Sequence, residues 1–372
     1  MAKAVAVLHG ITPLMASSLR WRGPHDWEQF VCQQLRHTAA RHQRILALLS
    51  RIDEISRAEA VAFVALKGSA LHAMGLYACG QRPMADIDIL VRESDASTMA
   101  TLLQSLGYSQ TFAIWKHGVF EPRRQASAGV SPDKIAFGEN EHAAIKIELH
   151  THIAEQLPIS EADISELIFP RDYKPGLNPY PSNFALMLHL LLHAAGNIMP
   201  RSMRLIHLHD IALLAARLSS EEWQQLTQLR VAGRPMWWAV PPLRLVQRYY
   251  RHCVPEGVVK QLSPACPRAL NRASAHQLLS DVSLTELGNR LFPALDWTKT
   301  LSEKLEYVRG RFHPGPEQRA ILAMGRAESW AVNSGWSDMS RTRRALRGLL
   351  LRTPRPPPMY VVRAALAVSQ HR

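Results

Sequence analysis

The spacing of apolar residues divides the chain into helical and strand-like parts. Between residues 27 and 52, apolar side chains recur mostly three, four and seven positions apart, which is typical of an amphipathic helix. Residues 1–57 are therefore predicted to form an N-terminal helical region. In its main helix Asp26 is the expected N-cap, and Arg36 and Arg41 are expected on the solvent side.

Residues 58–155 alternate between short apolar runs and stretches with helical spacing. The predicted strands are 61–66, 87–91 and 143–150, with further strand residues in 112–120, and the predicted helices are 69–77 and 94–106, the second closed by Gly107. The order strand, helix, strand, helix, strand predicts a small mixed β-sheet. With helical regions before and after it, this sheet predicts an α+β fold.

Residues 156–310 are predicted to form a second helical domain. His189 and His193 lie four positions apart in a leucine-rich stretch, so they share one helix face and can either bind a metal or be buried in a core. Burial is the more common case, and the lack of an H-E-x-x-H pattern excludes a zincin metalloprotease. Trp237 and Trp238 are expected to pack between helices.

A group of charged and imidazole side chains follows the histidine pair. It consists of Arg201, Arg204, His207, His209 and Asp210. Such a group can bind a substrate phosphate, or it can form salt bridges between helices, and both interpretations stay open at this point.

Residues 311–372 are predicted to form a separate basic C-terminal segment. No acidic residue follows Asp338, and the last 34 residues hold eight arginines. Four prolines between residues 354 and 358 break this segment into two short helical pieces. A segment of this kind binds nucleic acid or an anionic membrane surface electrostatically, or is simply a solvated appendage.

Composition and charge narrow the classes of partner. The chain has 372 residues, 47% of them hydrophobic, a formal net charge of +13 and a pI near 10.0. This excess of positive charge favours a polyanionic partner such as a nucleotide, a nucleic acid or a phosphorylated substrate. The four cysteines form no C-x-x-C pair, and no apolar run is long enough for a transmembrane segment, so a cytoplasmic protein is expected.

The candidate chemistry begins in the predicted strand 86–91. Strand side chains alternate, so Asp86 and Asp88 point to one face and the intervening isoleucines to the other. Two neighbouring carboxylates repel each other unless a cation lies between them. Hard divalent cations such as Mg²⁺ take carboxylate ligands together with substrate phosphates.

Two further features complete a plausible site. Lys67, Gly68 and Ser69 form a turn after a predicted strand, where a small residue lets phosphate oxygens approach the backbone. In strand 143–150, Glu148 lies on the polar face and is a candidate third metal ligand or general base.

These residues resemble the bacterial "uncharacterised nucleotidyltransferase" family of the DNA polymerase β-like superfamily. The resemblance spans roughly residues 5–260. The matching residues in the core are Leu66-Lys67-Gly68-Ser69, Tyr77, Arg82, Asp86 to Val91, Leu106-Gly107-Tyr108 and Glu148-Leu149-His150. The specific part is the combination of Lys67-Gly68-Ser69 with Arg82, Asp86 and Asp88. The helical matches are weaker: residues 9–14, Leu188-His189, His193, residues 209–211 and Glu222-Trp223.

The resemblance implies a mixed-sheet nucleotidyltransferase core at residues 58–155. It implies that Gly68 and Ser69 hold the triphosphate of an NTP, that Asp86 and Asp88 bind two Mg²⁺ ions, and that Glu148 is the third carboxylate. Two departures are visible: 16 residues separate Ser69 from Asp86, more than in most members of the superfamily, and Glu148 stands where Asp is more common.

The sequence therefore predicts transfer of an NMP group from an NTP to an acceptor. In this hypothesis Lys67 and Arg82 neutralise triphosphate charge, and Glu148 takes up the acceptor's proton. The alternative is a non-catalytic nucleotide- or nucleic-acid-binding protein on the same fold. The acceptor stays open between tRNA, a small molecule such as a phosphorylated metabolite or an antibiotic, and a peptide.

Overall fold

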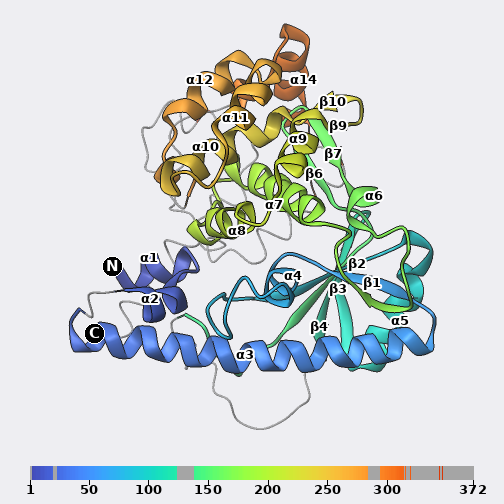
Figure 1. Ribbon diagram of the computed structural model, residues 1–372. Helices are drawn as coiled ribbons and strands as arrows, with labels where there is room; N and C mark the ends of the chain where they lie inside the picture. Colours follow the sequence, from blue (N-terminus) through green and yellow to red (C-terminus); the bar gives the residue numbers. More distant parts are fainter. Residues whose placement is uncertain are drawn as a thin grey trace.

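A computed structural model describes residues 2–19, 23–123, 138–283 and 294–313, together with Gly315, Arg319, Arg343 and Leu346. The fold is α+β, as predicted, and is built on a mixed six-stranded sheet with the strand order β3-β4-β5-β2-β1-β8. Figure 1 shows helix α3 along one side of this sheet and most of the other helices on the opposite side. The strands of the sheet are β1 (Ala62–Ala65), β2 (Asp86–Val91), β3 (Tyr108–Ile114), β4 (His117–Pro122), β5 (Lys146–His150) and β8 (Gly176–Asn178).

The N-terminal region is helical, as its spacing predicts. It consists of α1 (Ala2–Leu8), α2 (Thr12–Ser18) and α3 (His25–Ala58). The prediction of Asp26 as the N-cap of α3 is wrong, because Pro24 occupies that position in an extended conformation. Asp26 instead lies in the first turn, where a negative charge is favourable, and its carboxylate accepts a hydrogen bond from Lys3 Nζ at 2.8 Å.

Arg41 does not face solvent, contrary to the expectation from the helical pattern; it is only 4% exposed. Its guanidinium donates hydrogen bonds of 2.6–3.0 Å to the carbonyl oxygens of Met84, Ala85, Ala143 and Ala144. These four carbonyls precede β2 and β5, so one side chain of α3 holds together the starts of the two strands that carry the candidate carboxylates.

The two faces of the sheet enter different hydrophobic cores, which confirms the predicted alternation in β2. Ile87, Ile89 and Val91 pack toward α3 and α5 (Ala96–Ser105), whereas Leu90 packs toward the helices on the other side. Asp86 and Asp88 alternate with the isoleucines, so they lie on the face that is covered by the C-terminal helices.

The helix α7 (Asn183–Ile198) is the most buried element of the C-terminal part and packs against α8 (Leu205–Ala215). Trp237 and Trp238 are buried in the same core, as predicted. No described helix is long and apolar enough to cross a membrane. The remaining elements are α4 (Gly68–Ala73), β6 (Ala154–Leu157), β7 (Ser160–Asp163), α6 (Ser165–Ile168), α9 (Ser220–Gln228), β9 (Arg230–Val231), β10 (Arg234–Pro235), α10 (Val240–Tyr249), α11 (Glu256–Leu262), α12 (Arg268–His276), α13 (Leu279–Val282) and α14 (Leu301–Phe312).

Two predictions about domain organisation stay predictions: the end of the core at residue 155 and the separate basic segment at 311–372. The sheet includes β8, which pairs in parallel with β1 and comes from beyond residue 155, the predicted end of the core. The basic C-terminal segment lies almost entirely outside the described residues, and of its arginines only Arg311, Arg319 and Arg343 belong to them.

Replacing Arg41 tests whether this side chain ties the strands together. Arg41→Ala leaves several buried carbonyl groups without a donor, so we expect the free energy of unfolding to fall by about 2–4 kcal/mol in urea denaturation. Arg36→Ala, at an exposed position of the same helix, should change it by less than about 0.5 kcal/mol. Equal losses for the two variants would show that Arg41 has no special role.

Candidate active site

The parallel pairing of β2 and β5 brings two carboxylates side by side. In this register Asp88 is opposite Glu148, and Asp86 is opposite Lys146. Paired residues of neighbouring parallel strands point to the same face, so the Asp88 and Glu148 side chains project together toward α7. The structure thus brings together two of the three predicted carboxylates. The third, Asp86, lies two residues before Asp88 on the same face of β2.

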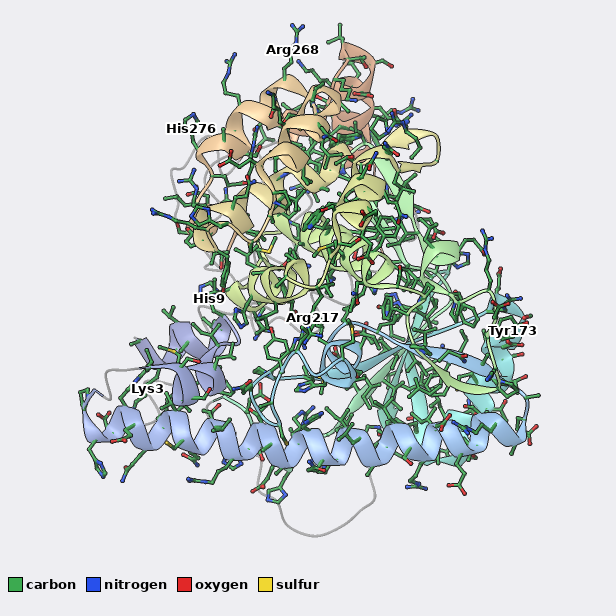
Figure 2. All side chains as sticks on the ribbon, viewed as in Figure 1. Lys3, His9, Tyr173, Arg217, Arg268 and His276 are labelled. Atoms are coloured by element: carbon green, nitrogen blue, oxygen red, sulfur yellow. The ribbon has the colours of Figure 1, made fainter. Side chains whose placement is uncertain are left out.

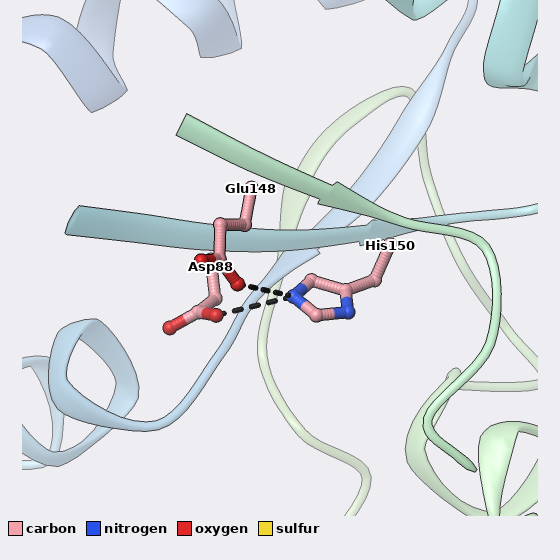
Figure 3. Close-up of side chains that lie close together, drawn as sticks. All are labelled: Asp88, Glu148 and His150. Carbon is pink, nitrogen blue, oxygen red and sulfur yellow. Dashed lines mark hydrogen bonds and ion pairs between the residues drawn. The ribbon is translucent and has the colours of Figure 1, made fainter. Parts of the chain in front are cut away.

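Two basic side chains of the protein itself, Lys67 and His150, lie against these carboxylates. Lys67 Nζ donates a hydrogen bond to Asp88 Oδ1 at 2.9 Å. The Nε2 atom of His150 lies 3.1 Å from Asp88 Oδ1 and 3.4 Å from Glu148 Oε2, so this imidazole bridges the two acids (Figure 3). Asp88, Glu148 and His150 each offer one potential metal-binding atom, and these three atoms all lie within 4.8 Å of one another.

Burial and these charges shift the pKa values in different directions. Burial alone would raise the pKa of Asp88, but Lys67 and His150 hold that pKa well below its ordinary value. Hydrogen bonds to Asp88 and Glu148 outweigh burial at His150 and raise the pKa of its imidazole. At Asp86, burial together with the charges of Asp88 and Glu148 outweighs the attraction of Lys67 and Arg82 and raises the pKa to about 7.

Lys67 adopts an unusual backbone conformation, with φ of +46° and ψ of −112°. A side chain with a Cβ reaches this region at a cost of about 1–3 kcal/mol, so surrounding contacts must hold it there. The Lys67 N–H donates to Tyr180 Oη at 3.4 Å, and Tyr180 Oη in turn lies 2.7 Å from His189 Nδ1 on α7. The Lys67 turn is therefore held from two sides, by Asp88 and by α7.

The predicted phosphate-binding turn packs against a buried ion pair. Arg82 Nε and Nη2 donate to the two oxygens of Asp210 at 2.8 and 2.7 Å, and Tyr77 Oη donates to the same carboxylate at 2.6 Å. A Cβ added to Gly68 would collide with the Arg82 guanidinium, so this turn position requires glycine. Ser69 follows in the buried first turn of α4.

For Asp210 this ion pair shows the salt-bridge interpretation, while phosphate binding by the basic side chains of the same group stays a prediction. Asp210 lies on α8, and Arg82 lies just before β2, so their salt bridge links a C-terminal helix to the sheet. Arg204 donates from Nε to the carbonyl of Leu8 at 2.7 Å and so links α8 to the N-terminal helices. A direct contact of Arg82 with phosphate stays a prediction, since its guanidinium is already bound to Asp210 in this structure.

A cavity of about 180 Å³ lies beside Glu148, between the sheet and α7. His189, which is buried, and His193, which is partly buried, both line it, as the more common interpretation of this pair predicts. Neither belongs to a cluster of three potential metal ligands among the described residues.

His150 belongs to the site in the structure but was not among the predicted site residues. The signal was present, since His150 shares the polar face of β5 with Glu148. The contact between Lys67 and Asp88 had no comparable signal, because it depends on the fold of the turn after β1.

The donor set fits a divalent cation. Two carboxylates supply the hard oxygen ligands that Mg²⁺ and Mn²⁺ prefer, and an imidazole is a common additional ligand of Mn²⁺ and Zn²⁺. The neighbouring charges of Asp88 and Glu148 already require cationic partners, which Lys67 and His150 supply in this structure.

The raised pKa of Asp86 predicts how stability depends on pH. The folded protein keeps a proton on Asp86 up to about pH 7, whereas the unfolded chain releases it near pH 4. The contribution of Asp86 to the free energy of unfolding therefore falls across this window in the presence of EDTA. Asp86→Asn removes this loss. The free energy of unfolding of the variant, relative to that of wild type, should therefore rise by about 1–3 kcal/mol from pH 5 to pH 8, as measured by urea denaturation.

A control separates this effect from general pH dependence. Glu54→Gln, at an exposed position of α3, should show a constant difference from wild type across the same pH range. A constant difference for Asp86→Asn as well would contradict the shifted pKa.

Comparison with known proteins agrees with this geometry. A family model described as "Uncharacterised nucleotidyltransferase" matches residues 3–233, well over half of the 372 residues. The match includes the carboxylates, the turn after β1 and the helices α7 and α8. No curated protein and no solved structure matches the chain. The chain therefore belongs to the uncharacterised nucleotidyltransferase family, as the motifs of its sequence indicate.

Proposed function

We propose that this protein transfers the NMP group of an NTP, such as ATP, to an acceptor with the help of Mg²⁺. The observation that carries the proposal is the side-by-side placement of Asp88 and Glu148 on adjacent parallel strands, within reach of one cation. Pure binding of a nucleotide needs no such concentration of acids. The family match supports nucleotidyl transfer in general.

The proposed roles follow from position. Asp86, Asp88 and Glu148 would hold two Mg²⁺ ions, with His150 orienting the carboxylates. When bound, the metal ions offset the charge that develops on the attacking and leaving oxygens. Glu148 lies at the edge of the cavity, where its carboxylate can accept the proton of an acceptor hydroxyl.

The phosphate side of the site would lie at the turn after β1. Gly68 and Ser69 would approach the triphosphate through the backbone, and Lys67 would exchange its contact with Asp88 for a phosphate oxygen. Arg82 adds positive charge behind the turn and keeps Gly68 in place through its own pair with Asp210.

The alternative function is a nucleotide- or nucleic-acid-binding protein without turnover. The positive net charge of +13 favours it as much as it favours an enzyme. The three acids count against it, because carboxylates repel phosphate unless a cation lies between them. Mg²⁺-dependent pyrophosphate release from any NTP would exclude it.

We also propose that the chain is divided into four regions and that the protein is cytoplasmic. We keep an N-terminal helical region at 1–57, a core at 58–155, a helical domain at 156–310 and a basic segment at 311–372. All four cysteines are free, which suits the reducing cytoplasm. tRNA, a small molecule and a peptide all remain candidate acceptors at this stage.

Removing one carboxylate tests the catalytic assignment. Asp88→Asn and Asp86→Asn keep the shape of the side chain but weaken the metal site. We expect Mg²⁺-dependent pyrophosphate release from NTPs to fall at least about 100-fold in each variant. Thermal unfolding should confirm that both variants are folded.

Asp172→Asn, at an exposed position away from the site, is the matched control and should retain wild-type pyrophosphate release. Wild-type rates in both site variants would rule out the assignment of these carboxylates.

Deleting residues 339–372 tests the basic segment. The deletion removes eight arginines, so binding of total RNA should weaken and its dependence on salt concentration should become less steep. Filter-binding measurements over a series of salt concentrations report both quantities. Unchanged affinity and slope would assign the segment no role in RNA binding.

A further inference from the structure

A basic groove lies among the C-terminal helices, beyond residue 233, where the family match ends. It consists of two adjoining pockets of about 800 and about 440 Å³, which share Arg244, Gln247 and Arg251. Its walls come from α10 and from α11 and α12, both of which contact α10 (Figure 1). No residue of this groove lines the cavity at the candidate active site. The groove is therefore a second candidate binding site.

The groove carries positive charge that little else offsets. Its cationic lining residues are Arg244, Arg248, Arg251 and Lys260, and its one acidic lining residue is Glu256. None of the four cations forms an ion pair with a carboxylate among the residues that the structure describes. Arg251 and Lys260 are exposed and make no hydrogen bond within the described part of the chain. This surface attracts an anionic partner.

Two of the arginines are held in position by neutral groups. Arg244 is partly buried and donates from Nη1 to Ser274 Oγ at 2.7 Å and to the carbonyl of Asn271. Arg248 Nη2 donates to the carbonyl of Ala275 at 2.8 Å. These contacts fix both guanidinium groups against α12 without neutralising them. The groove therefore offers charge that is already oriented before a ligand arrives.

The lining suits a solvated polyanion better than an enclosed small molecule. Sites for small molecules are mostly apolar and bury most of the ligand. Thirteen residues line the groove, and only four of them are apolar: Val254, Val259, Pro264 and Ala275. A phosphate backbone needs no apolar walls, because arginine and lysine bind it from one side while water solvates the other. The groove is concave, so a strand fits into it, whereas the flat surface of a membrane does not.

Two uncharged side chains favour RNA among the polyanions. Gln247 lines both pockets, is partly buried and makes no hydrogen bond among the described residues. Its amide offers donors and an acceptor, which match the ribose 2′-hydroxyl that DNA lacks. Tyr249, the last residue of α10, is 42% exposed, and its hydroxyl accepts a hydrogen bond from the N–H of Leu279 at 2.9 Å. An exposed aromatic ring of this kind can stack on an unpaired base.

We propose that the basic groove binds single-stranded RNA through its phosphate backbone. The proposal does not depend on nucleotidyl transfer, because the groove shares no lining residue with the cavity of the candidate active site. It is also separate from the prediction for the basic segment at 311–372, since the four cations of the groove all lie between residues 244 and 260.

Fluorescence anisotropy of the full chain with a labelled single-stranded RNA of about 20 nucleotides tests the groove. Arg251→Gln combined with Lys260→Gln removes two phosphate contacts at exposed positions, where substitutions rarely affect folding. We expect the affinity to fall about tenfold, and the slope of log K against log salt concentration to become less steep by about 1.4. Wild type should bind DNA of the same sequence about fivefold more weakly than RNA, and Gln247→Ala should remove this preference.

Arg36→Gln combined with Arg51→Gln is the matched control. It removes the same net charge from exposed positions of α3. The two ends of α12, Arg268 and His276, lie on the other side of the sheet from α3 (Figure 2). The affinity for RNA and the salt slope of this control should therefore change far less than in the groove variant.

Four outcomes would overturn the proposal. They are no RNA binding by wild type, equal losses in the groove and control variants, DNA binding as tight as RNA binding, and RNA binding that deletion of residues 339–372 abolishes but the groove variant leaves unchanged. None of them depends on NTP turnover. Failure of the proposed function would show differently, as RNA bound in the groove with no Mg²⁺-dependent pyrophosphate release from any NTP.

Discussion

The rest of the site depends on the crowding of negative charge between β2 and β5. Parallel pairing forces Asp88 and Glu148 onto one face at neighbouring positions, where their charges repel. The chain offsets this repulsion with the ammonium group of Lys67 and with His150, whose pKa these acids raise. Placing Lys67 there requires a strained backbone at the end of β1, which explains why Tyr180 and α7 hold the turn so closely. Acids that already draw a lysine and an imidazole to themselves are well suited to binding divalent cations.

The same arrangement explains why the helical parts are essential to the core. On one side α3 holds the starts of β2 and β5 through Arg41. On the other side α8 holds the Gly68 turn through the buried pair of Arg82 and Asp210. Neither contact touches the candidate cation site, yet each fixes a segment that presents a site residue. The helices on both sides therefore pack against the sheet around the carboxylates.

Much of the fold was predictable from local patterns. The alternation of Asp86 and Asp88 with isoleucines predicted both the strand β2 and the shared face of the acids, because that signal is contained in six consecutive residues. The buried role of Arg41 was not predictable, since its partners lie more than 40 residues away and helical spacing treats any arginine as a solvent-facing residue. The pair of Arg82 and Asp210 was not predictable from local patterns either, because these two residues are also far apart in the sequence. His150 is an intermediate case, visible on the polar face of β5 but not distinguishable from a surface histidine.

The most direct test of the central claim is a crystal structure with Mn²⁺ and a non-hydrolysable NTP. We expect anomalous scattering peaks beside Asp88 and Glu148, the triphosphate at the turn that contains Gly68, and Lys67 Nζ moved from Asp88 to a phosphate oxygen. Clear density for the nucleotide elsewhere, with Lys67 still on Asp88 and no anomalous peak at the carboxylates, would contradict the account.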